Sequence, residues 1–397
     1  MVDHYLLAGV AVSTLFAIVI GAALATCGFP LPRGVRFGCV DGLRGYLAIF
    51  VVFHHFVISI ACKTDHLWAE PAANVYNEFG KAAVALFFMA TGLVFYPRVV
   101  DGFVKTDWPS VYSGRLFRII PMLLVSTLLC ALIVATEHRV TLSAHLPVEI
   151  LEWLEGQQVP LFDVRTSYQV NAGVFWSIWW EWLFYFLVLP LTALIRQAFA
   201  RDGMRVMLIL LLTLSLLGRL SGMAVFTYLP LFVLGMLIAE IAAYARVRQV
   251  FSQPWASLPL LAALVCAATL FHVPYGVVPM ALLGGVLLGI AAGNDLFGLL
   301  SNRGARMLGE ISFCIYVLHG IVLHIAFRFY PVERNQLAVL PILVAVIVVA
   351  SALLSLAVEK PAIKIGKQSN AALPRYRARL TRLGRANAVR QGARPTV

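Results

Sequence analysis

The segment from Gly45 to Cys62 reads GYLAIFVVFHHFVISIAC and contains no Asp, Glu, Lys or Arg. A helix of this length rises about 27 Å at 1.5 Å per residue, which nearly spans the ~30 Å hydrocarbon core of a bilayer. Two histidines, His54 and His55, lie in its second half. The segment therefore predicts a membrane-spanning helix that carries polar rings at depth.

The rest of the chain repeats this apolar pattern. Of its 397 residues, 61% are hydrophobic and 13% are charged, whereas soluble domains contain about half and a quarter, respectively. The composition excludes a soluble domain and predicts an all-α fold, a polytopic membrane helix bundle. We expect about eleven transmembrane helices, at residues 5–26, 45–62, 80–97, 119–136, 173–195, 205–219, 223–243, 255–272, 274–291, 309–327 and 337–358.

Two parts of this pattern are irregular. The first apolar run follows Asp3 and His4 and lacks a positively charged start, so we expect a retained helix rather than a cleaved signal peptide. Four prolines interrupt the eighth and ninth spans, where a broken or re-entrant helix is expected if it lines protein or water. They are Pro254, Pro259, Pro274 and Pro279.

The distribution of positive charge predicts the orientation. With the C-terminus in the cytoplasm, the cytoplasmic segments carry 24 of the 31 Lys and Arg residues, as the positive-inside rule requires. The N-terminus is then outside. Residues 360–397 hold ten Lys and Arg and no acid, and so account for most of the net charge of +12. This composition suits anionic membrane lipids or a solvated tail, and we expect no nucleic-acid partner.

The six cysteines occur singly, without the CxxC or CxxH spacing of a metal or redox site. We therefore expect neither a disulfide framework nor a bound metal.

Ionisable side chains at membrane depth are costly, and they mark functional sites. His55 lies about 16 Å along its helix from Arg44, Glu181 about 12 Å below the outer start of the fifth span, and His319 about 14 Å from the inner end of the tenth. The three groups thus share a similar depth. We interpret them as a catalytic or proton-relay set. The alternative is that each one is a buried polar group that hydrogen-bonds a neighbouring helix.

Two arginines precede the fourth span. Arg115 and Arg118 are three residues apart and share one helix face. Guanidinium groups suit phosphate recognition, so together with Arg44 they form a candidate clamp for a polyanionic cytosolic ligand. The alternative is ordinary positive-inside anchoring.

Six short motifs follow one another along the chain. They are Arg44 followed by ten residues and His55, the FFMATG segment of the third span, the pair Arg115 and Arg118, WSIWWEWLFYF with Trp176, Ser177 and Glu181, ISFCIYVLH with Tyr316 and His319, and the closing Glu359-Lys360-Pro361. In this order they resemble the motifs of the membrane-bound acyltransferase family 3, whose members O-acylate bacterial glycans and other hydroxyl compounds. The resemblance runs from about Val40 to Pro361.

The resemblance implies a membrane O-acyltransferase that moves an acyl group, acetyl in the first instance, from cytosolic acyl-CoA to a hydroxyl of an extracytoplasmic glycan such as O-antigen or exopolysaccharide. The arginines would bind the acyl-CoA, and Trp176, Ser177 and Tyr316 are expected to contact the substrate. His55, oriented by Glu181 or by His319, would act as general base or accept the acyl group covalently. The expected location is a bacterial inner membrane.

The family core usually has ten helices and begins near the Arg-His motif. We therefore divide the chain into an extra N-terminal helix and linker (1–39), the acyltransferase domain (40–361) and a basic cytoplasmic tail (362–397). Two other functions stay open: a proton-coupled transporter, in which intramembrane His and Glu form a relay, and a subunit that hands the acyl group to a separate transferase.

Overall fold

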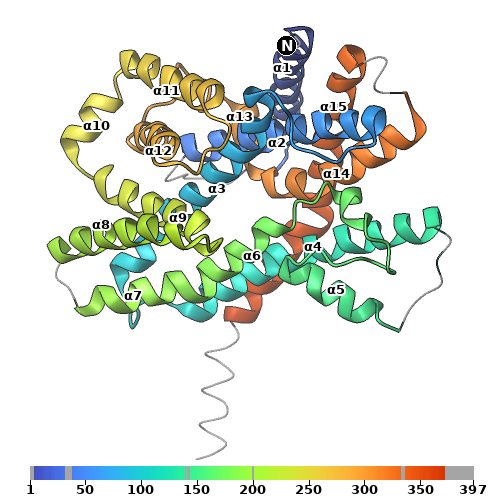
Figure 1. Ribbon diagram of the computed structural model, residues 1–397. Helices are drawn as coiled ribbons and strands as arrows, with labels where there is room; N and C mark the ends of the chain where they lie inside the picture. The colour runs from blue at the N-terminus through green and yellow to red at the C-terminus, as the bar shows by residue number, and fades with distance from the viewer. Residues whose placement is uncertain are drawn as a thin grey trace, which may run out of the picture.

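The computed structural model describes residues 4–31, 38–138, 140, 144–198, 201–331 and 336–371, and in these residues the chain is built from helices (Figure 1). The longer ones, in chain order, are α1 (His4–Thr26), α2 (Gly38–Asp65), α3 (Asn74–Asp101), α4 (Trp108–His138), α5 (Leu146–Glu155), α6 (Trp176–Leu183), α7 (Leu189–Ala198), α8 (Arg201–Gly218), α9 (Val225–Ile241), α10 (Ala245–Phe251), α11 (Ser257–Leu270), α12 (Val277–Ala291), α13 (Arg303–Glu310), α14 (Ser312–Phe329) and α15 (Gln336–Leu354). Short 3₁₀ turns are η1 (Ser167–Asn171), η3 (Arg219–Ser221) and η4 (Pro254–Ala256), and π-helical turns are η2 (Phe184–Val188) and η6 (Ser355–Glu359).

The all-helical membrane architecture predicted from the sequence is confirmed. Among the described residues, seven helices are long and apolar enough to cross a membrane, or eight if the bent pair α9 and α10 counts as one span. Each of the eleven predicted windows overlaps a helix. The expected number of eleven transmembrane helices is compatible with the structure. Besides these eight, the helices α8, α11 and α12 also overlap predicted spans, and they contain 18, 14 and 15 residues.

The eighth and ninth predicted spans, where a broken or re-entrant helix was expected, correspond to α11 and α12, and each of these helices is continuous. The sharp bend lies before them in the chain. Helices α9 and α10 meet at an angle of 98°. Beyond them, η4 begins at Pro254, and the residues between Leu270 and Val277 separate α11 from α12. Pro259 and Pro279 are the third residues of α11 and α12, where the missing amide hydrogen of proline breaks no helical hydrogen bond. The bend between α9 and α10 contains no proline.

Helices α2 and α3 lie at the centre of the bundle, between α11 and α12 on one side and α14 and α15 on the other (Figure 1). Helix α3 crosses α9 at Gly92 and Gly235, where a Cβ atom on either residue would overlap a backbone carbonyl of the other helix. Small residues allow this close approach of two membrane helices. Helix α1 contacts mainly α13 and α15, whereas α2 also packs against α3 and α14.

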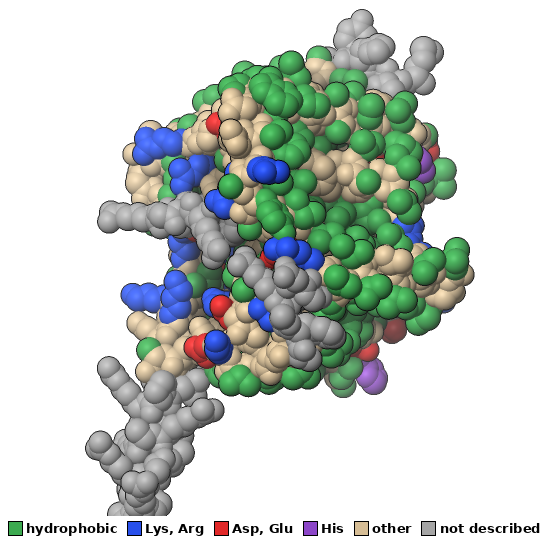
Figure 2. Space-filling view, turned by 90° about the vertical axis from the view of Figure 1, so that its left-hand side faces the viewer, with side chains coloured by type: hydrophobic (Ala, Val, Ile, Leu, Met, Phe, Trp, Pro, Cys, Tyr) green, Lys and Arg blue, Asp and Glu red, His purple; other side chains and the backbone are tan. Residues whose placement is uncertain are grey.

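Charged side chains are unevenly placed on the surface. On the face drawn in Figure 2, most Lys and Arg side chains gather toward one edge, and hydrophobic side chains cover broad areas beside them. The positive-inside rule expects such a distribution, with the basic edge on the cytoplasmic side. The last helix continues past Glu359 as far as Ala371, so the first ten residues of the predicted tail are helical, and residues 372–397 of it lie outside the described residues.

Candidate functional site

Two of the predicted site residues, His55 of α2 and His319 of α14, are in direct contact. The Nδ1 atom of His55 lies 3.1 Å from Nε2 of His319, although the two residues are 264 positions apart in the chain. His319 is fully buried, and its ring centroid is 5.1 Å from that of His55. The packing of α14 against α2 thus forms a pair of imidazoles inside the bundle.

The backbone around the pair determines which nitrogen carries the proton. Nδ1 of His319 lies 3.0 Å from the carbonyl oxygen of Ile315, and Nδ1 of His55 lies 3.1 Å from that of Val51. Because a carbonyl oxygen only accepts, we assign a hydrogen to each Nδ1 of the neutral rings. Nε2 of His319 then accepts from Nδ1–H of His55. This arrangement leaves the lone pair on Nε2 of His55, which is what a general base or nucleophile requires.

His55 lines a cavity of about 400 Å³ that we call the histidine chamber. Aromatic rings from six parts of the chain form much of its wall, together with the polar groups of Glu70, Lys81 and Gln158. The aromatic residues are Trp68, Tyr168, Trp176, Tyr228, Tyr275 and Tyr316. Several of these residues carry no motif in the sequence. Tyr228 is an example, and only the contacts of its ring with Trp176 and Tyr275 reveal its place in the chamber.

His54, the neighbour of His55, also lines this chamber. Its Nδ1 lies 2.9 Å from the carbonyl oxygen of Tyr76, and its ring packs on Gly80, where any Cβ atom would overlap it. Consecutive residues on a helix point about 100° apart. The helix therefore directs His55, and not His54, toward His319.

The side chains of Ser177 and Tyr316, which were predicted to contact the substrate, form a hydrogen bond with each other. Their hydroxyl oxygens are 2.7 Å apart, and the Tyr316 hydroxyl donates to the carbonyl oxygen of Val174 at 2.8 Å. This pairing joins α14 to the start of α6. Trp176 lies beside it, with its ring centroid 5.2 Å from that of Tyr228 and 6.5 Å from that of Phe88.

The three predicted arginines line a second cavity, of about 80 Å³, which we call the arginine cavity. Arg44 comes from α2, and Arg115 and Arg118 come from α4. The guanidinium group of Arg115 lies over the ring of Phe95, 5.1 Å from its centroid. The two helices thus bring together the arginines that the sequence assigned to one ligand.

Glu181 lies in the arginine cavity and not beside His55. Its Oε2 accepts a hydrogen bond of 3.2 Å from the Tyr185 hydroxyl, and it faces Arg44, Arg115 and Arg118 across the cavity. The reason is the axial rise of α6, because Glu181 is five residues beyond Trp176 and so about 7.5 Å further along the helix. Of the two groups expected to orient His55, His319 is therefore the one in contact with it.

One further residue of this region was not among the predicted site residues. Glu359 is 3% exposed and forms an ion pair with Arg118, whose Nε lies 3.2 Å from its Oε1. It also accepts hydrogen bonds from the Ser355 hydroxyl at 2.8 Å and from the Cys314 thiol at 3.2 Å. In the sequence, the motif Glu359-Lys360-Pro361 was the signal that could have identified Glu359, although the motif does not indicate that Arg118 is its ion-pair partner. The contact shows that Arg118 is held by a carboxylate, whereas Arg115 packs on aromatic rings.

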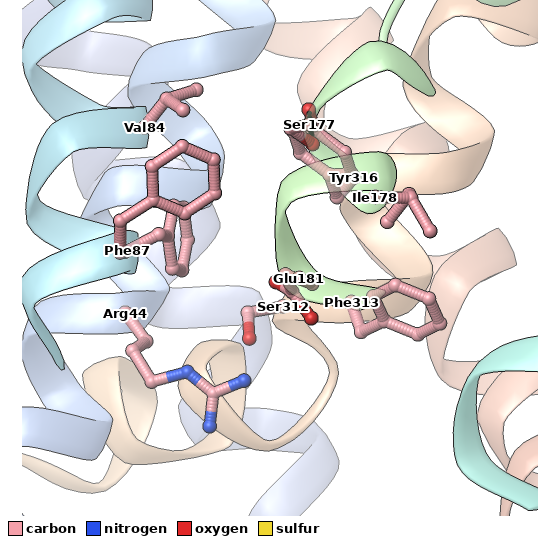
Figure 3. Close-up of a pocket in the computed structure, with 10 residues that line it drawn as sticks. Arg44, Val84, Phe87, Ser177, Ile178, Glu181, Ser312, Phe313 and Tyr316 are labelled. Carbon is pink, nitrogen blue, oxygen red and sulfur yellow. Dashed lines mark hydrogen bonds between the residues drawn. The ribbon is translucent and has the colours of Figure 1, made fainter. Parts of the chain in front are cut away.

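A small cavity of about 50 Å³, which we call the middle cavity, is lined by residues of α2, α3, α6 and α14 (Figure 3). It shares Arg44 and Glu181 with the arginine cavity, and Val84 and Tyr316 with the histidine chamber. In Figure 3, Val84 and Phe87 project from α3 on one side, opposite Ser177 and Tyr316. The three cavities therefore form a row from the arginines to the histidine pair.

The family of the chain follows from a comparison with known protein families. The model described as "Acyltransferase domain" matches residues 37–358. The comparisons with curated proteins and with solved structures give no match. The matched range contains all of the site residues predicted from the sequence, ends one residue before Glu359 and covers most of the chain, and the protein therefore belongs to the membrane-bound acyltransferase family 3.

Proposed function

We propose that this acyltransferase moves a short acyl group, acetyl in the first instance, from cytosolic acyl-CoA to a hydroxyl of an extracytoplasmic glycan such as O-antigen or exopolysaccharide. The observation that carries the proposal is the row of three adjoining cavities, with arginines at one end and a histidine pair in an aromatic chamber at the other. In this proposal the protein resides in a bacterial inner membrane, with its C-terminus in the cytoplasm.

The arginine cavity supports acyl-CoA as the donor. Among the residues that line this cavity, the three arginines Arg44, Arg115 and Arg118 outnumber the one carboxylate, Glu181. An excess of positive charge suits the phosphates of CoA, and guanidinium groups can bind phosphate oxygens in pairs. Arg115 has the greatest freedom to do so, because Arg118 is already bound to Glu359.

The histidine chamber supports a glycan as the acceptor. Its volume of about 400 Å³ falls in the range of about 300–1,000 Å³ typical of small-molecule sites. Aromatic walls with a few polar groups suit a sugar ring, which has apolar faces and polar edges. The charged pair of Lys81 and Glu70 lines the same chamber and offers a donor and an acceptor for hydroxyl groups.

The chemistry assigned to His55 follows from its free Nε2. This atom takes the proton of the acceptor hydroxyl, the hydroxyl oxygen attacks the thioester carbonyl carbon, and the carbon–sulfur bond breaks. The proton then passes to the departing CoA thiolate. In the covalent variant Nε2 attacks the thioester carbonyl carbon and CoA leaves as the thiolate. The acceptor hydroxyl oxygen then attacks the acyl carbon, the bond from that carbon to Nε2 breaks, and the hydroxyl proton passes to the thiolate. The middle cavity, at about 50 Å³, favours a short acyl group.

The test is a His55→Ala variant, made beside a His324→Ala control on α14. His324 pairs with Glu137 at 3.0 Å, away from the row of cavities. We expect mass spectrometry of surface glycans to show acetylation with the wild type and the control but none with His55→Ala, at equal amounts of protein in the membrane. Acetylation that survives in His55→Ala would refute the assignment. Purified protein should also transfer label from acetyl-CoA without an ion gradient, which a proton-coupled transporter would not do.

A further inference from the structure

A fourth cavity, which we call the α3 groove, shares no lining residue with the row of three. It has a volume of about 370 Å³ and lies between α2 and α3 on one side and α11 and α12 on the other. Its walls are almost entirely apolar, with residues such as Leu47, Phe50, Leu86, Leu264 and Leu283. The reaction proposed above makes no use of this groove.

One charged residue, Glu78, interrupts the apolar wall. Glu78 of α3 lines the groove, is 2% exposed, and has no hydrogen-bond partner for either carboxyl oxygen among the described residues. Two nearby nitrogen donors are bonded elsewhere, because Lys81 pairs with Glu70 and the Asn77 amide nitrogen donates to the carbonyl oxygen of His272. Buried polar groups in proteins are nearly always hydrogen-bonded. The carboxyl group therefore indicates a missing partner inside the groove.

The surroundings of the groove indicate what enters it. Helices α2 and α3 are candidate membrane spans, and the lining residue Val265, on the apolar helix α11, is 59% exposed. The groove therefore opens toward hydrocarbon. Along α3 its lining extends from Val75 to Leu86, about 16 Å of helix, or roughly half the thickness of the bilayer core. One lipid chain fits these dimensions and this chemistry.

We propose that the α3 groove binds a membrane lipid that carries a free hydroxyl group next to its chain, with the chain along α3 and the hydroxyl at Glu78. A hydroxyl group both donates and accepts. It can therefore donate to the carboxylate or accept from the carboxylic acid, and it satisfies Glu78 in either protonation state. The proposal is independent of acyl transfer, since the groove lies outside the row of cavities.

The test compares two photoactivatable probes in phosphatidylglycerol nanodiscs: hexadecan-1-ol with a diazirine in its chain, and the alkane that lacks only the hydroxyl. After irradiation, peptide mass spectrometry locates the label. We expect the alcohol to label the groove helices, and we expect Glu78→Leu to lower this labelling by about threefold to tenfold, the effect of one hydrogen bond. The alkane should label the groove as weakly as the alcohol labels it in Glu78→Leu.

Two tryptophan variants provide matched controls. Leu264→Trp fills the groove and should abolish its labelling, whereas Leu132→Trp on α4, at a position that is 61% exposed and remote from the groove, should leave labelling unchanged. Equal labelling of the wild-type groove by alcohol and alkane would overturn the proposal. That comparison needs no variant, so it decides the question even if Glu78→Leu fails to fold, and it does not depend on transferase activity.

Discussion

Replacing His319 with alanine removes the side chain that accepts a hydrogen bond from Nδ1–H of His55 at 3.1 Å. The carbonyl oxygen of Val51, also 3.1 Å from Nδ1, remains and keeps the ring in its tautomer. The variant should therefore retain a base at Nε2 but lose the group that stabilises His55 once it has taken a proton. We expect a slower reaction rather than a complete loss.

The size of the effect follows from this one contact. When His55 becomes an imidazolium ion, its bond to His319 becomes charge-assisted, and such bonds contribute about 1.5–3 kcal/mol. At about 1.36 kcal/mol per tenfold change in rate, kcat should fall about 10- to 150-fold. Loss of the base itself in His55→Ala should reach about 10²- to 10⁴-fold. KM for the donor should not change, because His319 does not line the arginine cavity.

The assay measures label transfer from acetyl-CoA in inside-out membrane vesicles that contain the endogenous acceptor, with kcat and KM determined separately. His319→Gln is the conservative variant, since its amide oxygen can accept the same hydrogen bond, and it should recover part of the rate. His324→Gln on the same helix is the control. A kcat for His319→Ala within twofold of the wild type, with His55→Ala inactive, would refute the role of this contact.

Three further predictions concern the other cavities. Arg118→Ala should lower the free energy of unfolding by about 3 kcal/mol, because Glu359 stays buried without its cation, and thermal unfolding in detergent measures this. Arg115→Ala should leave that stability nearly unchanged and raise KM for acyl-CoA about tenfold; equal effects of the two substitutions on stability and on KM would contradict the division of roles. Val84→Trp, at the border between the middle cavity and the histidine chamber, should stop transfer while acyl-CoA still binds, and loss of both in a folded protein would contradict the row of cavities as the path.

Part of the site could be predicted from the sequence because helical rise is known. The rise per residue gave His55 and His319 the similar depth at which they meet, but it gave the same depth to Glu181, which lies in the arginine cavity. Rise does not specify how each helix is rotated or which helix lies beside it. The contact of Arg118 with Glu359 is an example, since neither residue indicates the other in the sequence.

The aromatic wall of the histidine chamber illustrates the same difference. Trp176 lies in a recognisable motif, but Tyr228 and Tyr275 lie in segments that the sequence marked only as apolar or rich in proline. Their place depends on how α9 and the link between α11 and α12 pack against α3 and α6. Such contacts arise between distant parts of the chain, so no local pattern predicts them.

The sequence alone determined that the chain is an all-helical, multi-pass membrane protein, because it contains apolar segments of membrane length. Within hydrocarbon, such a segment must satisfy its backbone hydrogen bonds internally, as a helix does. The motifs within those segments determined its family. Only the tertiary structure decided that His319, and not Glu181, contacts His55, and that Glu78 faces an apolar groove without a partner. The physical reason is that side-chain contacts between helices depend on their mutual rotation and closeness, which the packing of the whole bundle sets.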